Sequence, residues 1–225
     1  NGSHKFTNGG INQTTEVTGG DGAYVHIDQN DPKYQFTSYV YNQYRRSSDS
    51  GATFTSYNFD ASSTNGKFIN PTDYDNSTGN LYCAWSSGNY AIWLNAKTTS
   101  SFTTVSAGFT GQVSAVTVDE NTANRVWFGT DSRRVYYVDN AASSPSVTNT
   151  TSSFPSGWPS SGTVSSIAIE KGKSSHILVT FSNYGVNSVW ESTNTGANWT
   201  SVEGNLPDMP IRWAMFSPIG SDSAL

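Results

Sequence analysis

Short runs that alternate apolar and polar residues recur along the chain, and four of them close on an acidic residue. These runs occupy residues 25–28, 72–75, 116–119 and 167–170, and a fifth begins over 214–218. The last positions of the five runs are 47, 44, 51 and 48 residues apart. Strict alternation predicts half-buried β-strands, and a period in the forties with several strands per unit indicates a repeat architecture.

Each unit contains three more strand-like runs, separated by Gly, Pro, Asn and Asp turn residues. The second runs cover 35–40, 81–85, 126–129 and 177–181; the third cover 43–46, 91–94, 135–138 and 188–191; short fourth runs are clearest at 53–55 and 198–200. Four antiparallel strands per unit predict an all-β fold, a β-propeller segment that forms part of a larger ring.

We therefore expect one incomplete propeller domain. Its parts are the end of a preceding blade (1–22), four blades (23–63, 64–107, 108–157 and 158–206) and the start of the next blade (207–225). A 3.6-residue period is nowhere sustained, so helix should be nearly absent.

Composition narrows the class of protein further. Charged residues make up only 13% of the 225 residues and aromatic residues another 13%, so Ser, Thr, Asn and Gly must supply most of the polar surface. Such a surface is common on secreted β-proteins that meet neutral polymers. A net charge of −5 argues against nucleic-acid binding, and no apolar run approaches the roughly 20 residues that span a bilayer. The single cysteine, Cys83, lies in a strand run and is expected to be a buried thiol.

Two of the predicted turns share a motif. Ser47-Ser-Asp-Ser-Gly-Ala-Thr-Phe54 and Ser192-Thr-Asn-Thr-Gly-Ala-Asn-Trp199 place an Asp or Asn where it can cap turn amides, and a Gly at a positive-φ position. This pattern resembles the Asp-box of BNR/Asp-box propellers, a group that includes sialidases, sortilin-type receptors and xyloglucanase-type glycoside hydrolases. The motif residues Asp49, Gly51, Phe54, Asn194, Gly196 and Trp199 are expected to be structural.

The stretches 19–28, 44–51 and 204–210 are similar to sortilin-like and xyloglucanase-like repeat proteins secreted by Bacteroidetes. The second and third units depart from the pattern, with residues 95–102 and 139–147 in place of the box. The resemblance implies a secreted or cell-surface location and export by type IX secretion, with outer-membrane secretion machinery as a partner.

A propeller carries its function on the face built by loops that enter the first strands and loops that join second to third strands. The strongest ligand-binding candidates there are Tyr41, Tyr90, Arg133, Tyr184 and Arg212. Further residues on these loops are Asp21, Asn42, Asn65, Lys67, Asn89, Gln112, Asp131, Arg134, Trp158, Asn183 and Asp208. Aromatic rings mixed with amides, carboxylates and guanidinium groups suit carbohydrate binding, while the alternative is that these side chains are solvated or shield strand ends.

Hydrolysis of a glycan would require two carboxylates across a cleft. Asp21 and Asp208 are weak catalytic candidates, whereas the recurrence of Asp28, Asp75 and Asp119 favours turn capping. His4, His26 and His176 show no metal-ligand spacing, so neither a metal nor a cofactor is predicted.

Three functions follow from these patterns. The first is a non-catalytic binding or scaffold module that presents loops to a glycan or a protein. The second is part of a xyloglucanase-like glycoside hydrolase. The third is a structural passenger or spacer in a surface adhesin.

Overall fold

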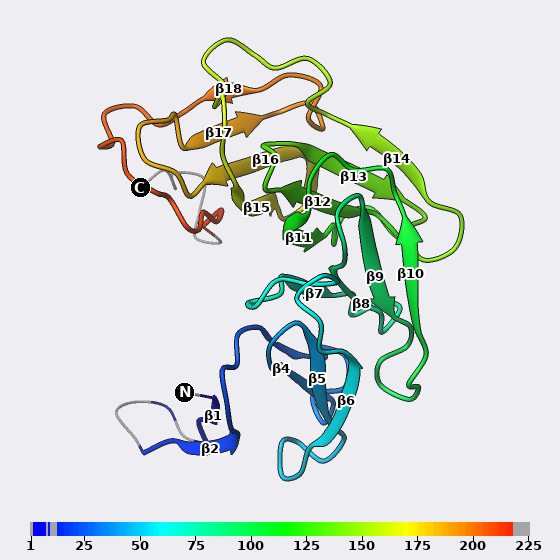
Figure 1. The fold of residues 1–225 in the computed structure, drawn as a ribbon. Helices are drawn as coiled ribbons and strands as arrows, with labels where there is room; N and C mark the ends of the chain where they lie inside the picture. The colour runs from blue at the N-terminus through cyan, green and yellow to red at the C-terminus, as the bar shows by residue number, and fades with distance from the viewer. Residues whose placement is uncertain (1, 8, 10–12, 218–225) are drawn as a thin grey trace. The chain divides into compact units, whose positions relative to one another are not determined.

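The computed structural model describes residues 2–7, 9 and 13–217, and in these residues it contains strands and turns but no helix. No described helix could therefore cross a membrane. The chain divides into two compact units, residues 1–86 with 90–106 and residues 87–89 with 107–225. Figure 1 shows the strands of each unit.

Unit 1 contains two four-stranded antiparallel sheets, each with its strands in chain order. The first consists of β3 (Val25–Ile27), β4 (Gln35–Ser38), β5 (Asn42–Ser47) and β6 (Thr55–Asp60); the second of β7 (Thr72–Tyr74), β8 (Leu81–Ala84), β9 (Asn89–Trp93) and β10 (Phe102–Ser106). A separate two-stranded sheet pairs β1 (Ser3–Lys5) with β2 (Thr15–Thr18).

Unit 2 repeats this plan. One sheet consists of β11 (Val113–Val118), β12 (Val126–Thr130), β13 (Val135–Asp139) and β14 (Ser146–Asn149); the other of β15 (Val164–Glu170), β16 (Lys173–Phe181), β17 (Val189–Ser192) and β18 (Thr200–Ser201). The prediction of an all-β fold built from four-stranded antiparallel sheets is confirmed.

The position of one predicted strand needs correction. The fourth strand of the first sheet begins at Thr55 and not at Thr53, because residues 49–53 are consumed by a hydrogen-bonded turn. Its alternating Tyr57 and Phe59 pack against Trp93 of the next sheet, with ring centroids 4.5 and 5.2 Å away. The blade start at 207–225 stays a prediction: its described part, residues 207–217, contains no strand, and its remainder, including Pro218 of the 214–218 run, lies outside the described residues.

Large aromatic side chains fill the space between neighbouring sheets within each unit. In unit 1, Phe36, Tyr44 and Trp93 are each at most 1% exposed. In unit 2, Trp127, Phe181 and Trp190 are equally buried. Each such side chain removes a large apolar area from water, so pairing of the sheets is the main source of stability. Cys83 is a fully buried thiol in the unit 1 core, as predicted.

The recurring aspartates cap the turn between the first and second strands, as the sequence predicts. Oδ1 of Asp28 accepts hydrogen bonds from the amides of Asn30 and Asp31, both at 2.8 Å. Asp75 and Asp119 accept the equivalent pairs of amides in their own turns. A short acidic side chain that satisfies two turn amides explains why an acid returns at this position.

Asp28 also joins its sheet to the next one. Its Oδ2 accepts a hydrogen bond from the Tyr74 hydroxyl at 2.7 Å and an ion pair from Lys97 at 2.9 Å. The Asp28 side chain is fully buried. Its carboxylate accepts from four donors, namely two turn amides, the Tyr74 hydroxyl and the Lys97 ammonium group. A charge removed from water requires such complete pairing.

The two motif turns have the same geometry. Asp49 accepts hydrogen bonds from the Ala52 and Thr53 amides and the Thr53 hydroxyl, and the Ser47 hydroxyl accepts one from the Gly51 amide. In the second turn Asn194 accepts from the Asn198 amide at 2.8 Å, and Ser192 accepts from the Gly196 amide at 2.8 Å. Gly51 and Gly196 both have a φ of +75°, which explains the glycine. The structural interpretation of these turns therefore has a direct physical basis.

Hydrogen bonds from the side chain and amide of Thr53 and from Ser47 hold the pKa of Asp49 well below its ordinary value. Stability due to this carboxylate is then complete above its unfolded pKa of about 4 and is lost as the pH falls below that value. We expect Asp49→Asn to keep the fold, because Asn194 fills the same role, but to reduce the loss of stability between about pH 5 and pH 2. Urea unfolding at several pH values measures this effect, with the exposed Glu120→Gln as the control. Identical pH profiles for the wild type and Asp49→Asn would show that the turn carboxylate contributes nothing.

Candidate functional site

The two ends of the sheets in unit 2 differ in their loops. The turns between first and second strands and the turns between third and fourth strands lie at one end. Loops 131–134 and 182–188, which join second to third strands, lie at the other end, together with 150–163 and 202–212, which precede or follow whole sheets. This division follows from the antiparallel order of each sheet. We call residues 131–134, 150–163, 182–188 and 202–212 the loop surface.

Hydrogen bonds tie the loops of this surface to one another. The Trp158 indole donates to the Arg133 carbonyl at 3.1 Å, and the Thr163 amide donates to Asn183 Oδ1 at 2.8 Å. Gly185 donates its amide to the carbonyl of Asp208 at 3.4 Å. Loops held in this way present their side chains with little loss of entropy on binding.

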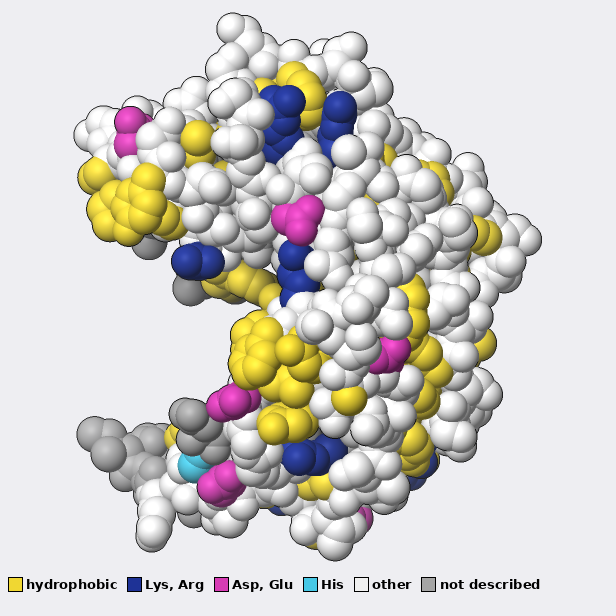
Figure 2. Space-filling model, in the orientation of Figure 1, with side chains coloured by type: hydrophobic (Ala, Val, Ile, Leu, Met, Phe, Trp, Pro, Cys, Tyr) yellow, Lys and Arg dark blue, Asp and Glu magenta, His cyan; other side chains and the backbone are white. Residues whose placement is uncertain are grey.

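Two guanidinium groups flank one aromatic ring on the loop surface. The guanidinium carbons of Arg133 and Arg134 each lie 4.1 Å from the centroid of the half-buried Phe154 ring. Each group also donates one hydrogen bond to a loop carbonyl, Arg133 to Pro159 at 2.8 Å and Arg134 to Thr151. In Figure 2 cationic side chains lie beside a hydrophobic group over these loops. Neither arginine forms an ion pair with a carboxylate in the described part of the chain, so two fixed cations lie close together without a counter-ion.

Exposed apolar side chains lie on the same surface. Tyr184 is 75% exposed, Met209 53% and Leu206 49%. The candidate residues Arg212 and Asp208 are exposed as well. The loop surface therefore exposes a guanidinium group, an aromatic ring and a thioether that a partner can contact.

The acidic residues at this end of unit 2 have mostly structural roles. Asp131 accepts a hydrogen bond from the Gln112 amide at 2.9 Å, and Glu203 is buried against the Ser188 amide. Among the described residues of the loop surface, Asp208 is thus the exposed carboxylate.

Several predicted surface residues are instead part of the interior. Trp158 is only 6% exposed and packs against Phe181 and Trp190. Tyr90 is fully buried, so its ring cannot contact a ligand in this structure. Asn42 is also fully buried, and accepts hydrogen bonds from Tyr44 and Asn70. From the sequence alone, it could not be predicted whether a Trp or Tyr next to a loop would be buried or exposed.

Unit 1 carries its own exposed residues at the corresponding loops. Asp21 is exposed. Tyr41 is half-buried, with its ring edge-on to Phe68 at 5.8 Å. Phe68 and Ile69 are about half exposed, at 51% and 49%. The prediction of ligand binding at Tyr41 is compatible with this local apolar patch.

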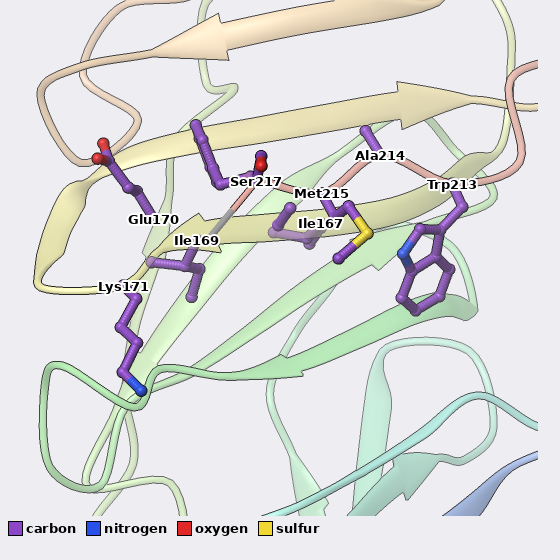
Figure 3. A pocket seen from close by; sticks show the side chains of 10 residues that line it. Ile167, Ile169, Glu170, Lys171, Trp213, Ala214, Met215 and Ser217 are labelled. Carbon is purple, nitrogen blue, oxygen red and sulfur yellow. The ribbon is translucent and has the colours of Figure 1, made fainter. Parts of the chain in front are cut away.

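A second concave region of unit 2 was not anticipated from the sequence. A cavity of about 670 Å³ lies between residues 167–171, on and after β15, and residues 213–217. Figure 3 shows Ile167, Ile169, Met215 and Trp213 directed to one side of these segments, and Glu170 to the other. The 48-residue spacing of the runs placed the 214–218 segment in the repeat but gave no sign of a cavity.

His176 of β16 lies between two carboxylates. Its Nδ1 contacts Glu170 at 2.5 Å and its Nε2 contacts Glu191 at 2.7 Å. Burial alone would lower the pKa of His176, but the hydrogen bonds to Glu191 and Glu170 outweigh this effect and raise the pKa. Lys173 also pairs with Glu170 at 2.8 Å, and the Phe216 ring lies 4.6 Å from the imidazole.

No protein-family model and no curated protein sequence matches the chain. Solved structures resemble it in fold. A GH74 xyloglucanase from Xanthomonas campestris aligns with a TM-score of 0.60 and 16% identity, over 85% of this chain and 32% of the xyloglucanase chain. YCF48 bound to D1 peptide aligns with a TM-score of 0.60 and 12% identity, over 91% of this chain and 62% of YCF48.

A chain of the Mitotic Checkpoint Complex aligns with a TM-score of 0.58 and 13% identity, over 83% of this chain and 53% of that one. The chain thus spans less than two thirds of each of these three proteins. At such identities the likeness shows the fold alone, and together with the four-stranded sheets it identifies the chain as a β-propeller segment.

At the loop end of unit 2, Trp158 is buried and Tyr184 is exposed, and mutation can test this difference in burial. We expect Trp158→Ala to lower the free energy of unfolding by about 3–5 kcal/mol, because a cavity replaces a buried indole. Tyr184→Ala should change it by less than about 0.5 kcal/mol. Urea unfolding of both variants provides the measurement, and similar losses for the two would contradict the assignment.

The His176 contacts predict a pH dependence of stability. Because the folded pKa is raised, their contribution is complete below the unfolded pKa of about 6.5 and is lost as the pH rises through the folded pKa. We expect the wild type to lose more free energy of unfolding than His176→Gln between about pH 6 and pH 9. Urea unfolding at several pH values measures this difference. If the free energy of unfolding changes with pH equally in both proteins, a charged His176 in the folded state is excluded.

Proposed function

We propose that the chain is a non-catalytic binding or scaffold module whose loop surface holds a glycan or a protein that carries carboxylate groups. The observation behind this proposal is the pair of guanidinium groups on Phe154. Arg133 and Arg134 have fixed positions and no carboxylate partner among the described residues, although the whole chain has a net charge of −5. Arginine binds a carboxylate through two parallel hydrogen bonds, so an acidic partner suits this arrangement.

The apolar part of the same surface supports binding as well. Tyr184 and Met209 project from loops that are hydrogen-bonded to each other. Exposed aromatic side chains on rigid loops are typical of recognition surfaces, and the ring of Tyr184 can stack on a sugar face or pack on an apolar side chain.

Glycoside hydrolysis has less support within unit 2. A hydrolase needs two carboxylates about 5–10 Å apart. On the loop surface Asp131 and Glu203 are held by backbone amides, which leaves Asp208 as the exposed acid. The likeness to GH74 enzymes concerns the fold and keeps a xyloglucanase-like activity as the second candidate function.

The polar, charge-poor surface supports a secreted or cell-surface location for this module. Export by type IX secretion and a role as an adhesin spacer stay proposals of the same kind. A sorting domain encoded after this region in the parent gene would support the export route.

Binding measurements test the main proposal. We expect immobilised chain to bind poly-L-glutamate or polygalacturonate more tightly than neutral xyloglucan, with an affinity that falls as salt is raised. Arg133→Gln/Arg134→Gln should weaken this binding by about tenfold or more. The control is Lys33→Gln/Lys173→Gln, which removes the same charge from lysines already paired with Asp31 and Glu170. Equal losses in both double variants would mean that only net charge matters.

The enzyme alternative is tested with the same neutral polymer. Incubation with xyloglucan should produce no new reducing ends if the chain only binds. Release that disappears in Asp208→Asn or Asp21→Asn would replace the binding proposal with hydrolysis.

A further inference from the structure

The two arginines of the loop surface bring two positive charges close to one another. Their guanidinium carbons each lie 4.1 Å from the centroid of the Phe154 ring, so the two carbons are at most twice this distance, about 8 Å, apart. Arg133 is fixed by the Pro159 carbonyl and Arg134 by the Thr151 carbonyl. Two like charges held this close repel each other, and a partner with two negative charges at a similar spacing relieves the repulsion.

The acids of the loop surface do not neutralise this pair. Asp131 accepts a hydrogen bond from a backbone amide, Glu203 is buried against another amide, and Asp208 is exposed. In the described part of the chain none of these carboxylates forms an ion pair with either guanidinium group. A guanidinium group has five N–H donors, and each of these two donates one hydrogen bond to a loop carbonyl. Most of the donors are therefore left for a partner.

Arg133 has a backbone conformation that a glycine adopts more easily. Residues 85–89 and 130–134 form loops of equal length between paired residues of two hairpins. The fourth residue is Gly88, with a φ of +82°, in the first loop and Arg133, with a φ of +56°, in the second. This left-handed conformation costs an arginine free energy, whereas a glycine adopts it without strain. The side chain at position 133 therefore contributes something that a glycine could not supply.

The rest of the loop surface suits a peptide better than a sugar. The half-buried Phe154 ring already contacts both guanidinium groups and lies 6.3 Å from the Trp158 ring, which leaves it little area for stacking on a sugar. Leu206 and Met209 are 49% and 53% exposed. Aliphatic and thioether groups pack well on apolar side chains, and Arg and Met are enriched in protein interfaces. A peptide supplies both the carboxylates and the apolar side chains.

The spacing of the arginines selects how the two acids are arranged. In an extended peptide, alternate side chains lie on the same side and are about 6.7 Å apart, at about 3.3–3.4 Å per residue. Neighbouring side chains point to opposite sides, and side chains four positions apart are separated by about 13 Å. We propose that the loop surface binds a peptide segment with acidic residues at alternate positions, one carboxylate on Arg133 and the other on Arg134. This inference rests on the proposed function and names the partner of that same surface.

Competition by short peptides tests the arrangement of the acids. Three capped peptides of equal length, built from serine and threonine, displace poly-L-glutamate from the immobilised chain. The paired peptide has two glutamates separated by one threonine, the separated peptide has the same two glutamates eight residues apart, and the single peptide has one of the paired glutamates replaced by glutamine. We expect the paired peptide to compete at least about tenfold better than the other two, because only it can place a carboxylate on each arginine without bending.

Single substitutions assign one carboxylate to each arginine. Arg133→Gln and Arg134→Gln should each reduce the advantage of the paired over the single peptide to about twofold or less, since one guanidinium group can hold only one carboxylate. Arg133→Gly should do the same and unfold at a higher temperature than Arg133→Gln, because it relieves the backbone strain. Lys33→Gln is the control, since this lysine already pairs with Asp31, and should keep the full advantage.

The possible failures are distinguishable. An absence of poly-L-glutamate binding would remove the proposed function and this inference with it. Equal competition by the paired and separated peptides, or no competition by any peptide, would overturn the inference and leave the proposed function standing. Displacement by polygalacturonate but not by the paired peptide would assign the surface to an acidic glycan. An advantage of the paired peptide that survives in Arg133→Gln would place the second cation elsewhere and overturn the inference as well.

Discussion

The structure depends on one constraint: a four-stranded sheet with two apolar faces is stable only when both faces are covered. Trp93 in unit 1 and Trp127 and Trp190 in unit 2 lie fully buried between neighbouring sheets. Their burial supplies most of the apolar contact, since each sheet has little core of its own. The hydrogen-bonded turns, including the buried carboxylate of Asp28, fix the spacing at which these rings can pack.

The charged side chains at the two ends of unit 2 have different kinds of partners. At the turn end Asp119 accepts two backbone amides, and Glu170 pairs with Lys173 and His176. At the loop end the cations Arg133 and Arg134 lack such partners and are held by an aromatic ring and loop carbonyls. A weakly charged protein thus keeps a small area of fixed positive charge, and this favours recognition of an acidic partner over acid–base chemistry at that end.

The cavity beside β15 lies against the segment that follows the last sheet of unit 2. Residues 211–217 lie beside β15, where the Ser165 hydroxyl donates to the Ile211 carbonyl as the Ser114 hydroxyl of β11 donates to the Val164 carbonyl. The Trp213 and Met215 side chains of this segment are 65% and 69% exposed.

Alternating runs with a period in the forties determined the sheets, and the aspartates that end three of these runs determined the caps, because both depend on neighbours in sequence. The motif turns at Asp49 and Asn194 could be predicted for the same reason. The burial of Trp158 and Tyr90 and the exposure of Tyr184 could not be predicted in this way. Aromatic residues near similar loops become buried or exposed according to whether a neighbouring sheet covers them. Only the tertiary structure places both arginines against Phe154 and Trp213 beside β15, because these contacts join residues about 20 to 50 positions apart whose approach depends on how the sheets pack.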